Sequence, residues 1–363
     1  MNSCKGTKIR YFLRNFREWL LLAEKKNIMK TLLTYTPDLD ELSSAEKYDL
    51  AKAITSVEKF IKSSSKISDV NYATRDAHSK TYATANGVLR VSDDLPEFIQ
   101  EIFKEKEYDL IARFSNANLV INKKGRDFPA YGFSLKIKNI NGRDANFPLV
   151  NFPLFPTNSP SAFLRFFTSV NTFLVTKQDN FLVSALDLPS LVKNGLPLFA
   201  SLLSVDFIKE IIKFIRRRNH FFFSFPYGGI GCYRLGDHVM KIGLQPVRNL
   251  GKTGKDEPQK KSIPDFISLH DSEFMLTVKM CENQKDQPVN NLMKMWKNAP
   301  EYTLGKITIP KNSALNSSSP DVENLNFNPF ENAEILQPVG KIQGTRKKIY
   351  EASISTRNKL NGI

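Results

Sequence analysis

The chain has 363 residues, 41% hydrophobic and 11% aromatic, so it can bury a sizeable core in one large domain or two small ones. Its 52 basic and 37 acidic residues give a net charge of +15, which favours anionic partners and says little about the fold. Cys4, Cys232 and Cys281 are far apart and form no C-x-x-C pair. This excludes a disulfide framework and a structural zinc site, and it predicts a reducing, cytoplasmic compartment.

The N-terminal part is expected to be a helical extension covering residues 1–66. Residues 8–33 place apolar and basic side chains on different sides of one amphipathic helix, whose apolar centre is too short for a signal peptide or a membrane span. Two uses of this helix stay open: packing against its own domain, or peripheral contact with an anionic membrane surface. A second helix is predicted from Ser44 to Lys62, ended by the serine-rich residues 63–65.

From Tyr72 the sequence changes to short alternating runs separated by turn residues, which is typical of strands. One run reads Arg75-Asp-Ala-His78-Ser-Lys80 and continues to Gly87. Only four histidines occur in the chain, so His78 is considered as a candidate functional residue, although a single histidine on a strand is usually structural. A second run reads Arg113-Phe-Ser115, and a third contains Val150-Asn151-Phe-Pro-Leu-Phe155.

Residues 160–218 are predicted to be mostly helical and apolar. Prolines and charged residues interrupt every window that would be long enough to span a bilayer. Strands resume near residue 221 and continue to 310. A basic loop at 249–262 separates two of them but has no recognised nucleic-acid motif, so no nucleic-acid partner is expected.

An irregular passage from Lys311 to Val339 leads to a terminal helix that Gly340 and Gly362 delimit. Arg346, Tyr350 and Arg357 are four and seven residues apart, so they fall within about 40° of one another on one helix face. A guanidinium one turn from a tyrosine can hydrogen-bond and stabilise a phenolate, and an anionic tyrosine is a strong axial ligand for ferric haem. The alternative is an exposed basic helix with a tyrosine at its edge.

This terminal helix resembles the proximal helix of the haem catalases, in which R-x-x-x-Y is followed seven residues later by an arginine that binds a haem propionate. Arg75, His78, Lys80 and Gly87 match the distal strand of the same family, and Arg113-Phe-Ser115 is similar to its R-F-S strand. The resemblance covers residues 70–357 and keeps the family's order. It looks like the minimal branch of that superfamily, which also includes allene oxide synthases, without the C-terminal helical domain.

The resemblance implies an α+β fold, with an antiparallel β-barrel of the catalase type at residues 67–310. The insertion around 160–218 would cover this barrel or line a channel, and residues 311–363 would be a wrapping segment and the proximal helix. The implied cofactor is haem b, with Tyr350 as the iron ligand and Arg346 tuning it. The haem propionates would be bound by Arg75, Arg113 and Arg357. The haem ring would pack on Phe155. His78 would be the distal base, held in orientation by the Ser115 hydroxyl.

One position departs from the family, which has N-N-T-P with the first asparagine beside the distal histidine. Alignment on Pro153 places Val150 there, and Asn151 is the neighbouring candidate for this catalytic role. A shift of one residue along a strand would change the face on which Asn151 lies. We therefore expect weak turnover of hydrogen peroxide and a preference for bulky organic or lipid hydroperoxides.

Two other functions stay open. The protein could bind haem without turnover, as a carrier or sensor. It could instead be a membrane-surface protein with a degenerate site. An oligomer is compatible with the sequence but is not required by it.

Overall fold

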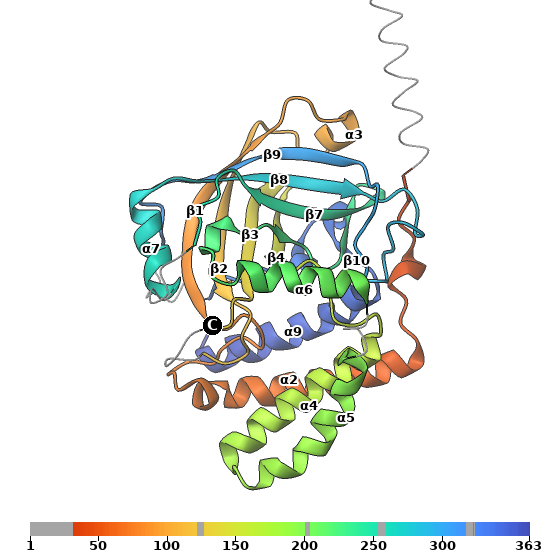
Figure 1. Ribbon diagram of the computed structural model, residues 1–363, viewed down its shortest axis with the longest axis vertical. Coiled ribbons are helices and arrows are strands. Elements are labelled where there is room, and N and C mark those ends of the chain that lie inside the picture. The colour runs from red at the N-terminus through yellow and green to blue at the C-terminus, as the bar shows by residue number, and fades with distance from the viewer. Residues whose placement is uncertain (1–31, 122–126, 200–203, 253–258, 317–321, 323) are drawn as a thin grey trace, which may run out of the picture.

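The computed structural model describes residues 32–363 except for 122–126, 200–203, 253–258, 317–321 and 323. Except for its last two residues, the helix predicted at 8–33 lies outside the described residues. Eight strands form a closed antiparallel barrel, and two short strands, β6 and β10, extend it (Figure 1). The strands are β1 (Thr81–Val91), β2 (Glu107–Asn116), β3 (Tyr131–Ile140), β4 (Arg143–Val150), β5 (Tyr227–Gly228), β6 (Cys232–Leu235), β7 (His238–Pro246), β8 (Ser272–Met280), β9 (Glu301–Ile309) and β10 (Pro338–Val339).

The pairing of the strands closes the barrel. Strands β1 to β4 pair in chain order, β4 continues through β5 to β7, and β7 pairs with β8. The ring is completed where β8 pairs with β9 and β9 with β1. This confirms the predicted α+β class with an antiparallel barrel.

Aromatic side chains fill the barrel core. Phe114, Phe133, Phe223 and Phe274 are at most 2% exposed. The ring centroids of Phe114 and Phe133 are 4.9 Å apart and those of Phe133 and Phe274 are 5.1 Å apart, both edge to face, which is a favoured aromatic geometry. Core packing therefore accounts for part of the 27 phenylalanines in the sequence.

The main helices lie outside the barrel. Helix α6 runs along its side, while α2, α4 and α5 lie beyond α9 (Figure 1). None of the helices in the described part of the chain is long and apolar enough to cross a membrane. The helices are α2 (Ser44–Ser68), α3 (Glu97–Gln100), α4 (Pro160–Asp179), α5 (Leu188–Phe199), α6 (Val205–Arg217), α7 (Gln259–Leu269) and α9 (Lys341–Asn361), and a 3-10 turn, η2 (Val183–Asp187), joins α4 to α5.

Helix α2 corrects one prediction. Ser43 caps it in a reciprocal capping box with Glu46, and the helix continues through the serine-rich residues 63–65 to Ser68. Ser64 is fully buried, and its hydroxyl donates a hydrogen bond of 2.7 Å to the Ile61 carbonyl oxygen. Because the serine satisfies its own polar group inside the helix and α2 packs on α4 and α9, tertiary packing overrides the local break signal.

The terminal helix α9 lies between the barrel and α2 (Figure 1). Its ends match the prediction, because Gly340 precedes it with φ 107° and Gly362 ends it with φ 73°. Both backbone conformations lie in the region that glycine adopts without steric cost. Ile349 on the inner side of α9 joins a small apolar cluster with Val57 and Phe60 of α2.

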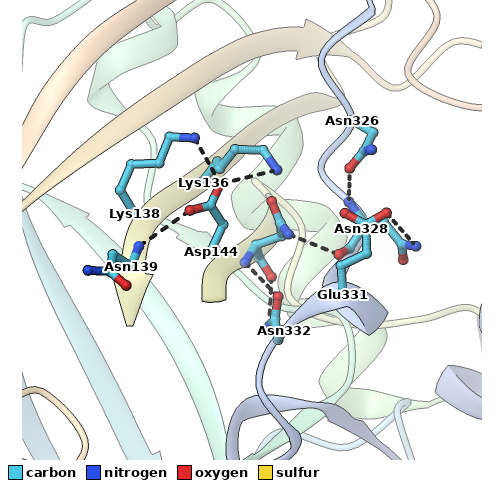
Figure 2. A network of polar contacts seen from close by, with 9 residues as sticks. Lys136, Lys138, Asn139, Asp144, Asn326, Asn328, Glu331 and Asn332 are labelled. Carbon is cyan, nitrogen blue, oxygen red and sulfur yellow. Dashed lines mark hydrogen bonds and ion pairs between the residues drawn. The ribbon is translucent and has the colours of Figure 1, made fainter. Parts of the chain in front are cut away.

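The wrapping segment before α9 is fixed to the barrel by asparagine side chains (Figure 2). Asn332 is fully buried, and its carboxamide exchanges hydrogen bonds with the backbone of Asn146 on β4, accepting at 2.7 Å and donating at 3.2 Å. The side-chain carboxamide of Asn146 in turn donates to the Asn328 carbonyl oxygen at 3.0 Å. These bonds hold the passage that leads into α9 at a fixed place against β4.

Candidate functional site

A cavity of about 240 Å³ lies between α9 and the barrel, and most of the residues predicted for the site line it. It is bounded by the segment before β1, by β2 and β4, by α4 and α9, and by the wrapping segment. Lining residues that bear on the chemistry are Arg75, Asp76, His78, Arg113, Val150, Phe155, Phe163, Arg346, Tyr350, Ser353 and Arg357.

On the α9 wall, Arg346 donates a hydrogen bond of 3.1 Å to the Tyr350 hydroxyl oxygen, as the four-residue spacing predicts. Its other terminal nitrogen donates to Gln343 Oε1 at 2.5 Å, so the guanidinium is held from two sides. Burial by itself lowers the pKa of Arg346, but the neighbouring Tyr350 and Tyr233 outweigh it and raise this pKa above its usual value. A permanent positive charge therefore lies against the tyrosine oxygen.

His78, another residue of the wall, lies just before β1 and not on the strand itself. Its backbone has φ 52°, a left-handed conformation that is uncommon for residues other than glycine. Its Nδ1 lies 3.2 Å from the Ser115 hydroxyl, which also donates to the Gly132 carbonyl oxygen at 3.3 Å. Because a hydroxyl has one proton, Ser115 accepts from Nδ1–H, and the Nε2 lone pair is left as the acceptor.

The His78 ring is neutral. Burial, together with the positive charges of Arg113 and Arg346, lowers the pKa of His78 to about 3. A neutral, oriented imidazole is a proton acceptor at neutral pH.

The ring of His78 lies directly over Gly132 of β3. A Cβ at Gly132 would come within 2.5 Å of the His78 Nδ1 and 2.7 Å of the Ser115 hydroxyl oxygen. No real Cβ tolerates such a contact, so only glycine at this position allows the ring to occupy its place.

Besides Arg346, three more arginines line the cavity and have different contacts. Arg113 is 4% exposed and donates to the His78 carbonyl oxygen at 2.6 Å and to the Thr81 hydroxyl at 2.9 Å, so it holds the unusual backbone at His78. Arg75 donates to the Leu325 carbonyl oxygen at 2.7 Å. Arg357 lies on the α9 face of Tyr350 and is 4% exposed.

Sequence reasoning missed a carboxyl group in this cavity. Asp76 accepts a hydrogen bond of 2.6 Å from Ser353, which lies one turn after Tyr350 on α9. Burial raises the pKa of Asp76 above its usual value, although the Ser353 hydroxyl and the charges of Arg357 and Arg346 act in the opposite direction. The signal was present, since Asp76 is inside the Arg75 to His78 motif and Ser353 has helical spacing from Tyr350.

The two residues considered for the position beside the distal histidine, Val150 and Asn151, lie in different places. Val150 lines the cavity, but Asn151 is not among the residues that line it. The Asn151 carboxamide accepts from the Tyr131 amide at 2.8 Å and donates to the Pro129 carbonyl oxygen at 2.9 Å. This corrects the placement of Asn151: it lies one residue past the end of β4, and its side chain is engaged in fixing the start of β3.

Aromatic rings cover the remaining side of the cavity. Phe155 lines it and packs on Phe163 of α4, with ring centroids 4.8 Å apart. Phe163 in turn stacks on Phe167, whose ring lies 5.7 Å away. The helical insertion therefore contributes an apolar wall, which the sequence did not assign to particular residues.

Comparisons with known proteins give matches to solved structures but not to family models or curated proteins. No protein-family model matches the sequence, and no curated protein matches it. Solved structures do: a fungal catalase (TM-score 0.56, 14% identity), catalase A from Saccharomyces cerevisiae (0.57, 14%) and a bacterial catalase (0.56, 13%). Each match covers 80% of this chain but only 60%, 62% and 58% of the respective catalase. The fold of this chain is therefore that of the catalases.

Proposed function

We propose that this protein holds a haem group in the cavity between α9 and the barrel and cleaves hydroperoxides there. The observation on which the proposal rests is that the Arg346 and Tyr350 pair and the neutral His78 line the same cavity. The Tyr350 oxygen, held as an anion by Arg346, could bind a ferric iron, and the His78 ring could accept a proton. The catalase fold supports the same reading.

The donor set fits haem. Tyr350 would bind the iron, with Arg346 stabilising its oxygen as an anion. Arg75, Arg113 and Arg357 would face the carboxylates of the cofactor, where guanidinium pairs well with carboxylate. When bound, ferric haem would supply the redox-active iron on which an O–O bond can be broken.

Side chains of the protein itself would carry out the proton transfer. The His78 Nε2, which Ser115 leaves available, would accept the proton of the hydroperoxide and return it to the departing oxygen. Ser115 and Gly132 fix the plane of the ring, and Arg113 fixes the backbone that bears it. This oriented ring avoids the loss of rate that a freely turning imidazole would cause.

The wall of the cavity supports hydroperoxides with an apolar group as substrates. Val150, Phe155 and Phe163 offer apolar surface, and the Asn151 amide is engaged elsewhere. Burial of an organic group would add binding energy that hydrogen peroxide cannot supply. Cumene hydroperoxide or a fatty-acid hydroperoxide is therefore expected to have a higher kcat/KM than hydrogen peroxide.

The test is expression with added iron and a haem precursor, followed by absorption spectroscopy and turnover. The wild type is expected to show a Soret band and to consume hydroperoxide faster than free haemin does. Tyr350→Phe should abolish stable haem uptake, whereas Tyr48→Phe at a position that is 62% exposed should not. His78→Ala should keep the Soret band and lose turnover.

The outcomes separate the alternatives. A coloured wild type that is no faster than free haemin would make the protein a carrier or sensor. A colourless wild type that is folded by circular dichroism would contradict haem binding altogether, and uptake of haem by folded Tyr350→Phe would contradict the assigned ligand.

A further inference from the structure

Helix α6 has apolar side chains on two opposite faces. On its inner face, Phe207 is 6% exposed and packs on Phe152, with ring centroids 5.3 Å apart. Phe214 contacts the same ring at 5.7 Å. These two contacts hold the helix to the rest of the molecule and leave its other face in solvent.

The outer face of α6 is apolar where a surface helix is ordinarily polar. Val205 is 64% exposed, Ile208 and Ile212 are each 43% exposed, and Ile215 is 48% exposed. Their spacings of three, four and three residues place them in one stripe about 80° wide along the helix. A stripe of this kind in water is an energetic cost unless something covers it.

Cations border this stripe. Lys209 and Arg216 follow it within about 40° on one side, and Arg217 and Arg218 come at the end of the helix. Lys213 is paired with Glu210 at 2.5 Å, so the contribution of that cation is reduced. An apolar stripe with a basic border is the pattern of a helix that lies in a membrane interface.

The elements that precede α6 in the chain also carry exposed apolar side chains. Eleven of the eighteen exposed large apolar side chains in the described part of the chain lie within residues 181–215, so they are concentrated and not scattered. Leu188, Val192 and Leu196 repeat every four residues along α5, and Leu182 is 80% exposed at the turn between α4 and α5. That turn is at the tip of a helical pair that projects from the body of the molecule (Figure 1).

We propose that the outer face of α6 is a docking surface for an anionic phospholipid membrane. A second copy of the chain fits less well. A two-fold contact sets the same patch against itself, which would bring Lys209 and Arg216 of both copies close together, and like charges repel. Anionic lipid head groups would meet these cations, and acyl chains would cover the apolar stripe.

The proposal is tested by flotation of the full-length protein with vesicles. Binding is expected to vesicles of phosphatidylcholine mixed with phosphatidylglycerol, and it should weaken as salt is raised. Ile212→Glu should weaken partitioning about tenfold, because it removes buried apolar area and adds a repelled charge. Lys209→Gln with Arg216→Gln should reduce the preference for the anionic vesicles.

Leu269→Glu is the matched control, because Leu269 is 68% exposed on α7, outside this surface, and its replacement should leave binding unchanged. Circular dichroism of each variant establishes that it is folded. Equal binding by wild type and folded Ile212→Glu would overturn the proposal, including the case in which the helix predicted at residues 8–33 alone binds lipid. A wild-type dimer that becomes monomeric in Ile212→Glu, without vesicle binding by either, would also overturn it.

Discussion

Ser353 on α9 donates a hydrogen bond of 2.6 Å to Asp76, two residues before His78. The same segment is joined to the end of α9 by Asn361, which accepts from the Ala73 amide at 2.8 Å and donates to the Ala73 carbonyl oxygen at 3.1 Å. The helix that presents Tyr350 therefore also positions the segment that presents His78. The two walls of the cavity are coupled through a direct contact.

The Asp76 carboxyl is predicted to make stability depend on pH. Burial raises its pKa above 3.8, so the folded protein binds this proton more tightly than the unfolded chain does. The contribution favours folding at acid pH and is lost as pH rises through the folded-state pKa. Asp76→Asn keeps an acceptor for Ser353, so we expect it to resist urea better than wild type at pH 7 and by a smaller margin at acid pH. Exposed Asp94→Asn should show neither effect.

A methyl group at Gly132 is predicted to displace the His78 ring. Gly132→Ala should lower kcat about 100-fold while leaving the Soret band in place, because the imidazole would leave its position over β3. The control is Gly228→Ala, where the nearest atom to an added Cβ is the Ile242 carbonyl oxygen at 3.7 Å. Steady-state kinetics on both variants checks this, and unchanged kcat in Gly132→Ala would refute the assigned role of the ring.

The pH profile of activity is predicted to lack the ordinary histidine limb. The pKa of His78 is lowered from 6.5 to about 3, so the ring stays an acceptor well below pH 6.5. For stability the sign is unfavourable, because the unfolded chain binds this proton below pH 6.5 and the folded protein does not until near pH 3. Values of kcat/KM from neutral to acid pH, over the range in which the protein stays folded, test this. Loss of activity centred near pH 6.5 would contradict it.

Val150 and Asn151 are predicted to respond differently to substitution. Val150→Asn places an amide in the cavity and should raise the ratio of kcat/KM for hydrogen peroxide to that for cumene hydroperoxide about tenfold. Asn151→Ala removes the two hydrogen bonds between the Asn151 carboxamide and the backbone. It should lower the free energy of unfolding by about 2 kcal/mol without changing that ratio. A changed ratio in Asn151→Ala would restore this residue to the site.

The asparagine network of the wrapping segment is predicted to be important for stability (Figure 2). Asn332→Ala leaves the Asn146 backbone amide and carbonyl without their partner in a buried place, so we expect a loss of about 2 kcal/mol in urea unfolding. Asn326 is half-buried and makes one hydrogen bond of 3.4 Å at the rim of the network, so Asn326→Ala should cost much less. Equal losses would show that the network is not the cause.

Several features followed from local sequence alone. Gly340 and Gly362 set the ends of α9, because only glycine adopts their backbone conformations without steric strain. Helical periodicity then placed Arg346 against Tyr350, since a spacing of four residues is one turn. Alternating apolar runs predicted the strands for the same reason: the repeat of a strand is a property of neighbouring residues.

Other features depended on residues distant in the chain. The left-handed backbone of His78, its ring over Gly132 and the burial of Asp76 beside Ser353 arise from contacts between separate elements, which no local pattern encodes. Asn151 was misplaced because its carboxamide bonds the backbone at Pro129 and Tyr131, twenty or more residues away, and no local pattern encodes these contacts. The sequence by itself determined the helix and its stripe, because those depend on the backbone repeat. The closed barrel decided which side chains share the cavity, because that depends on packing across the whole molecule.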